Sequence, residues 1–268
     1  MLAHASGKPM AVILAGHNGS GKSTMWHDHI ADELQVPLIN ADRMMLSILP
    51  TAGEDGHLRV WARRLRDSDE KWMVAAQKGV HSFVAQAMAQ KVPFAVETVF
   101  SHWKRKPDGT HESKIDLIKD LQETGYFVLL LFVGLANASL SLGRVAMRKA
   151  EGGHGVGVQK LLRRFSRTQH AVRHALPIAD AVILVDNSGS ASLPFTPCFV
   201  SAGPEVLYDL RRNGHIPAEM VRWLDIVAPI TDWLHPECPA LKPPPPHRAP
   251  SGPPPFASIR ALPPPLNA

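Results

Sequence analysis

One stretch near the start of the chain combines glycines, a lysine and hydroxyl side chains at the spacing G-x-x-x-x-G-K-S. It follows an apolar run at Met10–Ala15, typical of a buried strand, and precedes Met25–Leu34, which has a helical pattern. In this arrangement, the P-loop, backbone N–H groups and a helix N-terminus cradle phosphate. The lysine reaches the β- and γ-phosphates of a nucleotide, and the serine hydroxyl binds Mg²⁺. We therefore predict a nucleotide-phosphate site at Gly16, His17, Asn18, Gly19, Ser20, Gly21, Lys22, Ser23 and Thr24, rather than a glycine-rich turn that binds nothing.

A carboxylate, Asp42, follows the second predicted strand, Val36–Asn40. Phosphoryl transfer to an alcohol needs a group that accepts the hydroxyl proton near the γ-phosphate. We place this strand next to the first one, which makes Asp42 a candidate general base. Aspartate is also a favoured N-cap, and Asp42 precedes a short predicted helix at Arg43–Leu49. The residues alone leave both interpretations open.

Two further polar side chains, Glu97 and Thr98, close the third predicted strand at Val92–Val96. They could point into the same crevice and bind an acceptor or a metal-bound water, or they could form an ordinary solvated strand end. No apolar strand ends in the aspartate that usually supports Mg²⁺ in a P-loop site. We expect Glu97 or Asp42 to take that supporting role.

Positive charge concentrates between Ser141 and Arg173, where eight Lys and Arg residues accompany one Glu, in a chain of net charge +5. Two predicted helices, Asn137–Ala150 and Val158–Leu176, carry this charge on either side of the glycine-rich Gly152–Gly157. Arginine forks match phosphate oxygens, so the helices could close over a triphosphate as a lid. The alternative is that at least half of these arginines are exposed helix charges. A local basic cluster suits a small polyphosphate better than a long nucleic acid.

Histidines and cysteines give no metal-site pattern. His27 and His29 lie two residues apart on one predicted helix and do not face each other. His154 is expected to be a turn or lid residue rather than a catalyst. Cys198 and Cys238 lack metal-like spacing, which fits a reducing compartment.

The elements that must position these residues alternate between strand and helix. Such alternation predicts an α/β fold with a five-stranded parallel sheet, whose strand ends form one crevice for the P-loop, Asp42, Glu97 and Thr98. A long helical pattern at His57–Gln90 is expected to break at Arg66–Asp69, and Ser101–Thr110 is expected to be a loop. The predicted strands are Met10–Ala15, Val36–Asn40, Val92–Val96, Tyr126–Val133 and Ala181–Val185, and a further helix is predicted at Glu112–Glu123.

The motifs together resemble the zeta toxin-like P-loop kinases, over roughly Met10–Ser188. The matching residues are Gly16–Thr24, Asn40-Ala41-Asp42-Arg43, Glu97-Thr98-Val99-Phe100-Ser101, Arg144, Arg148, Gly152-Gly153-His154, Arg163-Arg164-Phe165 and Asp186-Asn187-Ser188. The resemblance implies Mg²⁺-dependent phosphorylation of a hydroxyl by ATP or GTP. In well-known members the acceptor is the sugar 3′-hydroxyl of UDP-N-acetylglucosamine.

The resemblance also assigns roles to individual residues. It makes Asp42 the catalytic base, and it places Glu97, Thr98 and Ser101 at the acceptor. Arg148, together with Arg144 or Arg163, would clamp phosphates. Asn187 joins the nucleotide site, and an antitoxin protein is a possible partner.

The resemblance, the weaker pattern after Ser188 and the proline content after Pro239 divide the chain into three parts. Residues 1–190 form the P-loop kinase domain, 191–238 a C-terminal extension packed on it, and 239–268 a proline-rich disordered tail. The extension is expected to hold short strands at Cys198–Leu210 and helices within Pro217–Leu234. The tail is either passive or a ligand for a proline-reading domain. No apolar run reaches the roughly 20 residues of a membrane span, and Met1–Lys8 lacks a signal-peptide order, so we expect a cytoplasmic protein.

Two other functional classes stay open. A polynucleotide or RNA kinase would use the basic segment as a track, but aromatic side chains for base stacking are sparse there. A nucleotide-dependent switch ATPase would bind ATP without transferring phosphate to an acceptor. Our first choice is a kinase for a small phosphorylated acceptor such as a nucleotide sugar.

Overall fold

A computed structural model of the chain describes residues 7–52, 57–151, 153, 155–189, 194–212 and 216–230. Its central sheet has seven strands in the order β11-β10-β9-β8-β1-β5-β2. Pairing is parallel from β9 to β2, whereas β10 is antiparallel to both β9 and β11. The strands are β1 (Met10–Gly16), β2 (Leu38–Ile39), β5 (Phe94–Thr98), β8 (Phe127–Gly134), β9 (Ala181–Asp186), β10 (Thr196–Ala202) and β11 (Glu205–Asp209). The α/β prediction is confirmed, but the sheet has seven strands rather than five.

The two additional strands form a hairpin at one edge of the sheet. The chain turns at Gly203, whose φ of +53° is accessible to glycine at little cost. Antiparallel pairing needs only this short turn and no crossover helix, so β10 and β11 can follow β9 directly. Short strands were expected at Cys198–Leu210, but their pairing with the parallel sheet was not.

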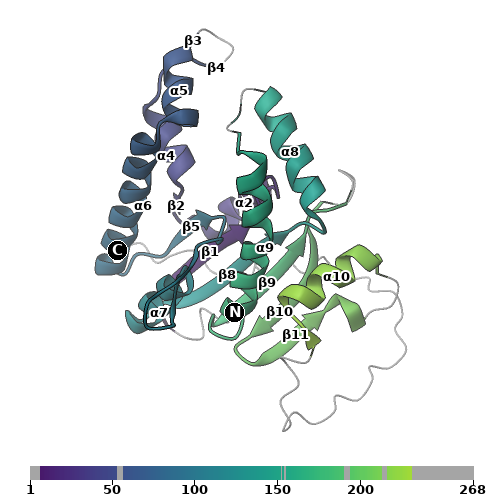
Figure 1. Cartoon of the computed structure of the whole chain (residues 1–268). Helices are drawn as coiled ribbons and strands as arrows, with labels where there is room; N and C mark the ends of the chain where they lie inside the picture. Colours follow the sequence, from purple (N-terminus) through teal and green to yellow (C-terminus); the bar gives the residue numbers. More distant parts are fainter. Residues whose placement is uncertain are drawn as a thin grey trace.

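Helices cover both faces of the sheet (Figure 1). Successive residues of β1 point to opposite faces, and both faces are buried, which explains its unbroken apolar run. One face packs against α6 (Glu70–Gln90), α7 (Ile115–Glu123), α9 (Val158–Ala175) and α10 (Ala218–Val227), and the other against α2 (Lys22–His29) and α3 (Ala31–Leu34). No helix within the described ranges is long and apolar enough to cross a membrane.

An arm stands beside the carboxyl edge of the parallel strands (Figure 1). It consists of α4 (Ala41–Ile48), the hairpin β3 (Thr51–Ala52) with β4 (His57–Leu58), α5 (Val60–Ser68) and the first part of α6. Leu49, Leu58 and Ala62 form a small core of its own. The expected break in the long helical pattern is confirmed, because the Asp69 side chain accepts a hydrogen bond from the Trp72 N–H and starts α6.

The segment expected to be a loop at Ser101–Thr110 contains strand structure. β6 (Trp103–Arg105) pairs antiparallel with β7 (His111–Ser113). Gly109 turns the chain at φ +83°, and Asp108 accepts hydrogen bonds from the Thr110 N–H and hydroxyl. The helix predicted from Glu112 therefore begins only at Ile115, because His111–Ser113 form a strand.

The last described helix packs into the carboxyl end of the parallel sheet. Trp223 of α10 is buried, and its indole Nε1 donates to Asp186 Oδ1 at 2.9 Å. A Cβ on Gly134 would lie 2.9 Å from the Trp223 ring, so only glycine fits there. Asp186 also accepts from the Ser188 hydroxyl at 2.7 Å. The end of β8 and the end of β9 are thus fixed next to the P-loop.

Candidate active site at the P-loop

The P-loop joins the end of β1 to the start of α2, as the sequence predicts. Gly19 and Gly21 have φ values of +71° and +87°, in the region that glycine adopts at little cost. A Cβ on Gly21 would lie 2.7 Å from Asn187 Nδ2, and a Cβ on Gly19 would lie 3.2 Å from the Arg144 Cβ. These glycines let neighbouring elements approach the loop closely.

Neighbouring side chains support the loop from behind. Asn187 Nδ2 donates to the Ser20 carbonyl at 2.9 Å, and the Ser141 hydroxyl donates to the Asn18 carbonyl at 2.6 Å. The resemblance placed Asn187 at the nucleotide, and the structure shows a side chain that holds the loop in shape. Its contact with a nucleotide stays a prediction.

The first turn of α2 has the features of an anion-binding site. It contains no acidic residue, and its leading N–H groups have no partner within the helix. Lys22 Nζ donates to the carbonyls of Gly16 and His17, at 3.3 and 3.1 Å. Burial lowers the pKa of Lys22, the Glu97 charge raises it, and Arg148 lowers it. A bound phosphate would add negative charge next to the buried ammonium of Lys22.

Glu97 joins three parts of the crevice. Its carboxylate accepts from the Ser23 hydroxyl at 3.0 and 3.1 Å and from Asn40 Nδ2 at 2.5 Å, and it lies 4.0 Å from Lys22 Nζ. The expectation that the second predicted strand adjoins the first was wrong, because β5 lies between β1 and β2. That insertion brings Glu97, near the end of β5, between the P-loop and Asn40. The Ser23 and Glu97 oxygens are hard donors of the kind that Mg²⁺ prefers.

Asn40, and not Asp42, is the N-cap of α4. Its Oδ1 accepts from the N–H groups of Asp42 and Arg43 at 2.8 and 3.2 Å. The capping interpretation of Asp42 is therefore wrong. Asp42 sits exposed in the first helical turn, and its charge raises the pKa of both Lys22 and Arg164. A carboxylate free of the capping role thus lies near two cations of the crevice.

Thr98 and Ser101 lie where the chain leaves β5. We had expected Glu97 and Thr98 to point into the same crevice. Neighbouring strand residues point to opposite faces of a sheet, so the two side chains point in different directions. Thr98 Oγ1 accepts from the Phe100 N–H at 3.2 Å, in a turn where Phe100 has φ +62°. Ser101 is half-buried after this turn. Acceptor contacts by Thr98 and Ser101 stay predictions.

The two basic helices, α8 (Ala138–Ala150) and α9, place their arginines differently. Arg144 is half-buried against Gly19, while Arg148 is exposed but close enough to lower the pKa of Lys22. Arg163 is exposed, and its Nε donates to the Gln159 carbonyl of its own helix at 3.2 Å. Its phosphate-clamping role stays a prediction.

Arg164 is the residue that the sequence analysis missed as a candidate. It is half-buried, burial lowers its pKa, and the Asp42 charge raises it. The available signal was its position three residues after Leu161 and four before Thr168, which are both buried on α9. Helical spacing turns Arg164 toward that buried side and Arg163 away from it.

The histidines of α2 lie apart from one another. His27 contacts the Arg43 guanidinium, and His29 packs edge-on to Phe195 with ring centroids 5.3 Å apart. His154 and Gly152, expected in the lid segment, lie outside the described residues, as do Cys238 and the proline-rich tail from residue 239.

A sequence model of one family, described as "Zeta toxin", matches residues 2–193. The chain belongs to the Zeta toxin family. It is also 28% identical over 144 residues to a protein of Haemophilus influenzae described as "Uncharacterized protein". That match covers 54% of this chain and 84% of the relative.

Two solved structures with a similar fold are complexes of AvrRxo1-ORF1 with AvrRxo1-ORF2. The complex with sulphate ions gives a TM-score of 0.58 at 17% identity, and the complex with ATP gives 0.53 at 16%. Each match covers 85% of this chain and 66% of the other chain, slightly under two thirds of its length. At these identities the likeness concerns the fold, which is that of P-loop kinase-like toxins.

In this Zeta toxin family member, the second P-loop residue contacts α9. The His17 ring stacks on Phe165, with centroids 3.9 Å apart and planes 12° apart, and it meets Phe132 of β8 edge-on at 5.3 Å. Burial, and then the Lys22 charge, lower the pKa of His17 to about 3, while the Phe165 backbone acts in the opposite direction. The ring is therefore neutral at any physiological pH.

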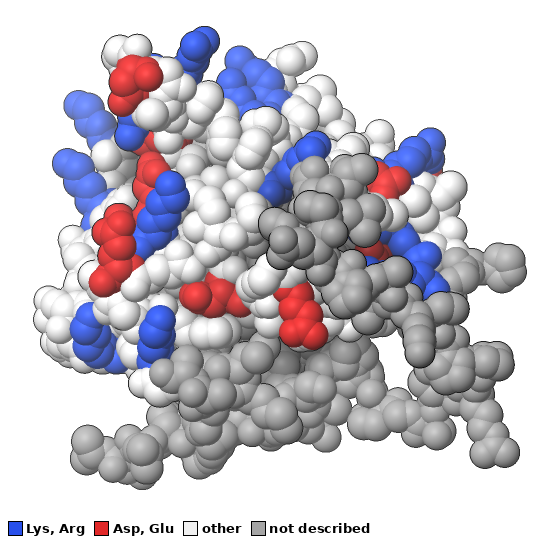
Figure 2. Space-filling view, turned by 90° about the horizontal axis from the view of Figure 1, so that it is seen from below, with Lys and Arg blue, Asp and Glu red and all other residues white. Residues whose placement is uncertain are grey.

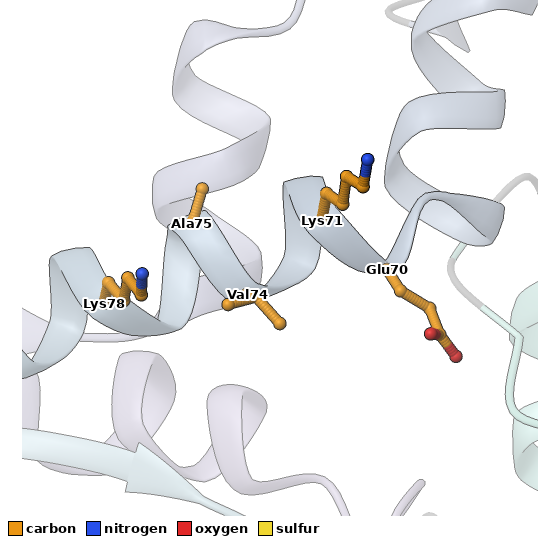
Figure 3. A pocket seen from close by; sticks show the side chains of 5 residues that line it. All are labelled: Glu70, Lys71, Val74, Ala75 and Lys78. Carbon is orange, nitrogen blue, oxygen red and sulfur yellow. The ribbon is translucent and has the colours of Figure 1, made fainter.

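Two open hollows of the described surface lie away from the P-loop. A cavity of about 430 Å³ is lined by Glu70, Lys71, Val74, Ala75 and Lys78, all on α6 (Figure 3). A second cavity of about 330 Å³ lies between the junction of α5 with α6 and Lys160. Neither is lined by a P-loop residue, so the chemistry of the crevice, and not its volume, identifies the candidate site.

Proposed function

We propose that this member of the Zeta toxin family is an ATP-dependent kinase that phosphorylates a hydroxyl of a small phosphorylated acceptor. The observation that carries the proposal is the position of Asp42. Its charge raises the pKa of the P-loop lysine, Lys22, and of the half-buried Arg164. Asp42 also lies two residues after Asn40, whose side chain bonds Glu97 beside the P-loop Ser23, and this position supports a general-base role toward an acceptor hydroxyl.

The residues divide the chemistry between them. Asp42 would accept the proton of the attacking hydroxyl, a contribution typically worth about 10²–10⁴ in rate. Lys22, Arg148 and Arg164 would balance the negative charge on the transferred phosphoryl group, since preorganised cations act mainly on the transition state. Asp42 is exposed, so an acceptor can reach it.

Mg²⁺ fits the Ser23 side of the crevice. Ser23 Oγ and the Glu97 carboxylate offer oxygen donors, and Asn40 orients Glu97 through its Nδ2. When bound, Mg²⁺ neutralises charge on the β- and γ-phosphates. Glu97 would support the metal and, with Thr98 and Ser101, one side of the acceptor.

The choice of ATP and of the acceptor rests on separate support. One structure of similar fold was solved with ATP. The basic helices α8 and α9 carry more positive charge than one triphosphate with Mg²⁺ requires, which favours an acceptor with phosphates of its own. A nucleotide sugar such as UDP-N-acetylglucosamine is our first choice.

A polynucleotide acceptor has less support. Figure 2 shows one face of the molecule, on which Lys and Arg side chains alternate with Asp and Glu. This view is from below and does not show the crevice at the carboxyl ends of the strands. The case against a nucleic-acid track rests instead on the scarcity of aromatic side chains for base stacking in the basic segment.

The proposal is tested by following the label from γ-labelled ATP in the presence of Mg²⁺. Matched reactions contain UDP-N-acetylglucosamine, a neutral sugar, an oligoribonucleotide or no acceptor. We expect label on the nucleotide sugar. Label on the oligoribonucleotide would establish a polynucleotide kinase, and phosphate release without an acceptor would establish a nucleotide-dependent ATPase.

We further propose that a partner protein binds this chain as an antitoxin. The support is that both similar structures reported above are two-protein complexes. Co-purification with the product of a neighbouring gene, and loss of acceptor phosphorylation on binding, would test it.

A further inference from the structure

We propose that the stack of His17 on Phe165 aligns α9 so that the neighbouring Arg164 faces the phosphates. His17 would then be a positioning residue of the transfer site, acting through Phe165 and not on the substrate. This inference rests on the proposed kinase function, and its test includes a binding measurement that does not need turnover.

His17 links the P-loop to two other parts of the molecule, the segment after β8 and α9, and also bonds the P-loop lysine. Its Nδ1 accepts from the Leu135 N–H at 3.1 Å, which fixes the ring in the segment after β8. Its carbonyl accepts from Lys22 Nζ at 3.1 Å. Its ring face lies 3.9 Å from the centroid of Phe165. A shift of residue 17 would therefore move both an acceptor of the P-loop lysine and the ring that packs on α9.

The bond from Leu135 also settles how the ring is protonated. Because Nδ1 accepts a hydrogen bond and the ring is neutral, the proton resides on Nε2. Nε2 is buried and makes no hydrogen bond of ordinary geometry among the described residues, although the Phe165 backbone lies close enough to raise the pKa of the ring. Such a donor costs stability, and an apolar ring would fill the space without that cost. The polar ring is explained if the Nδ1 bond is needed to hold its plane against Phe165.

α9 is attached to the rest of the site at two points on one face. Phe165 stacks on His17, and three residues later the Thr168 hydroxyl donates to the Val99 carbonyl at 3.1 Å, just after β5. Residues three apart lie on the same side of a helix, so these two contacts define the rotation of α9 about its axis.

Arg164 depends on that rotation. It lies beside Phe165 and is half-buried, in the electrostatic range of Asp42. Successive residues of a helix point about 100° apart, so a rotation of α9 by that angle would put Arg163 in the direction that Arg164 now takes. A displacement of about 1 Å at a charge-stabilising group can cost about 10²-fold in rate. Loosening the stack should therefore reduce transfer while Arg164 itself is intact.

The main test compares Phe165→Leu with Phe165→Tyr and with Leu162→Ala, a substitution at an exposed apolar residue of the same helix. We expect Phe165→Leu to lower kcat about tenfold or more with a smaller change in KM for ATP, and Phe165→Tyr to restore it. Leu162→Ala should behave as the unmodified protein. A Phe165→Leu variant with unchanged kcat would overturn the proposal.

The decisive measurement repeats Phe165→Leu in an Arg164→Ala background. If the stack acts through Arg164, Phe165→Leu has no further effect on kcat there. Effects that multiply would overturn the proposal, because they would show that Phe165 acts independently of Arg164. If Phe165→Leu reduces soluble yield, His17→Phe serves instead, since it keeps a ring against Phe165 and removes the Nδ1 acceptor together with the Nε2–H donor.

The unmodified protein, Phe165→Leu, Arg164→Ala and the double variant are titrated with a non-hydrolysable ATP analogue. Phe165→Leu and Arg164→Ala should weaken binding by similar factors that do not multiply in the double variant. A protein that binds the analogue in this pattern but transfers no phosphate would refute the proposed kinase function and leave the alignment of Arg164 supported. Multiplying factors would refute the alignment alone.

Discussion

The phosphate side and the acceptor side of the crevice are built in opposite ways. On the phosphate side, the P-loop is held by Asn187 and Ser141, and its lysine is buried against backbone carbonyls. On the acceptor side, Asp42 and Arg164 come from separate helices, α4 and α9. Asp42 is exposed, and Arg164 is only half-buried.

The two sides therefore differ in how they are held. Contacts within the chain hold the phosphate site in shape, which reduces the ordering cost of binding a nucleotide. The acceptor site needs α4 and α9 at a defined separation, which depends on the bond of Asn40 to Glu97 and on the contacts of α9 with His17 and Val99. Binding and transfer should therefore respond differently to substitution on the two sides.

The largest effect is expected on the phosphate side, from Lys22→Ala. Loss of the buried ammonium removes charge balance in both ground and transition states, so nucleotide affinity and transfer should both fall, with kcat/KM reduced by about 10³-fold or more. Calorimetric titration with an ATP analogue and a transfer assay measure the two losses. Lys149→Ala, an exposed lysine of α8, is the control. Wild-type affinity in Lys22→Ala would show that the nucleotide binds elsewhere.

Asp42→Asn should give the next largest effect, and it should separate binding from transfer. The amide cannot accept the hydroxyl proton, so kcat should fall at least about 10²-fold while nucleotide affinity stays close to that of the unmodified protein. Because Asn40 caps α4, the melting temperature should be nearly unchanged. A lower melting temperature with a normal kcat would contradict the assignment of Asp42 as the base.

A comparison of Arg164→Ala with Arg163→Ala tests which of these two arginines acts on the acceptor side. The residues are adjacent and chemically identical, but they differ in direction. Loss of a charged hydrogen bond is worth about 1.5–3 kcal/mol, so Arg164→Ala should reduce kcat about 10- to 100-fold, and Arg163→Ala should have little effect. Steady-state kinetics with saturating acceptor resolves the two. A larger fall in kcat for Arg163→Ala than for Arg164→Ala would assign the phosphate-clamping role to Arg163.

The smallest effect concerns the stability of the phosphate side and appears only in acid. The pKa of His17 is about 3 in the folded chain and near 6.5 when unfolded. Between these values the unfolded chain binds the extra proton, so the free energy of unfolding falls as the pH falls from 6.5 toward 3. At pH 5 the loss is about 2 kcal/mol. Urea unfolding of the wild type and His17→Phe at pH 7.5 and pH 5.0 should show a smaller loss in the variant, and equal losses would disprove it.

The sequence predicts the phosphate side well because local spacing determines it. A glycine-rich loop between an apolar strand and a helix specifies its own geometry, and β1 and Lys22 lie where expected, whereas the single helix predicted at Met25–Leu34 is divided into α2 and α3. The α/β fold follows for the same reason, from strands buried on both faces.

The acceptor side could not be predicted to the same depth, because it depends on strand order and helix rotation. Placing β5 between β1 and β2 is a tertiary choice, and it is what brings Glu97 between Ser23 and Asn40. Asn40 and Asp42 are both good caps, and only the hydrogen bonds show which one acts. The direction of Arg164 follows from the packing of α9. The sequence alone does not show which of the adjacent residues Arg163 and Arg164 faces the crevice.

The indole of Trp223 beneath the crevice has a consequence for where this protein can be cut. The family match ends at residue 193, yet Trp223 fills the space at Gly134 and hydrogen-bonds Asp186, directly behind the P-loop. A fragment that stopped at the end of the match would also bare the backbone edge of β9, which β10 now pairs. The part of the chain that the family model matches is thus shorter than the part whose elements pack together.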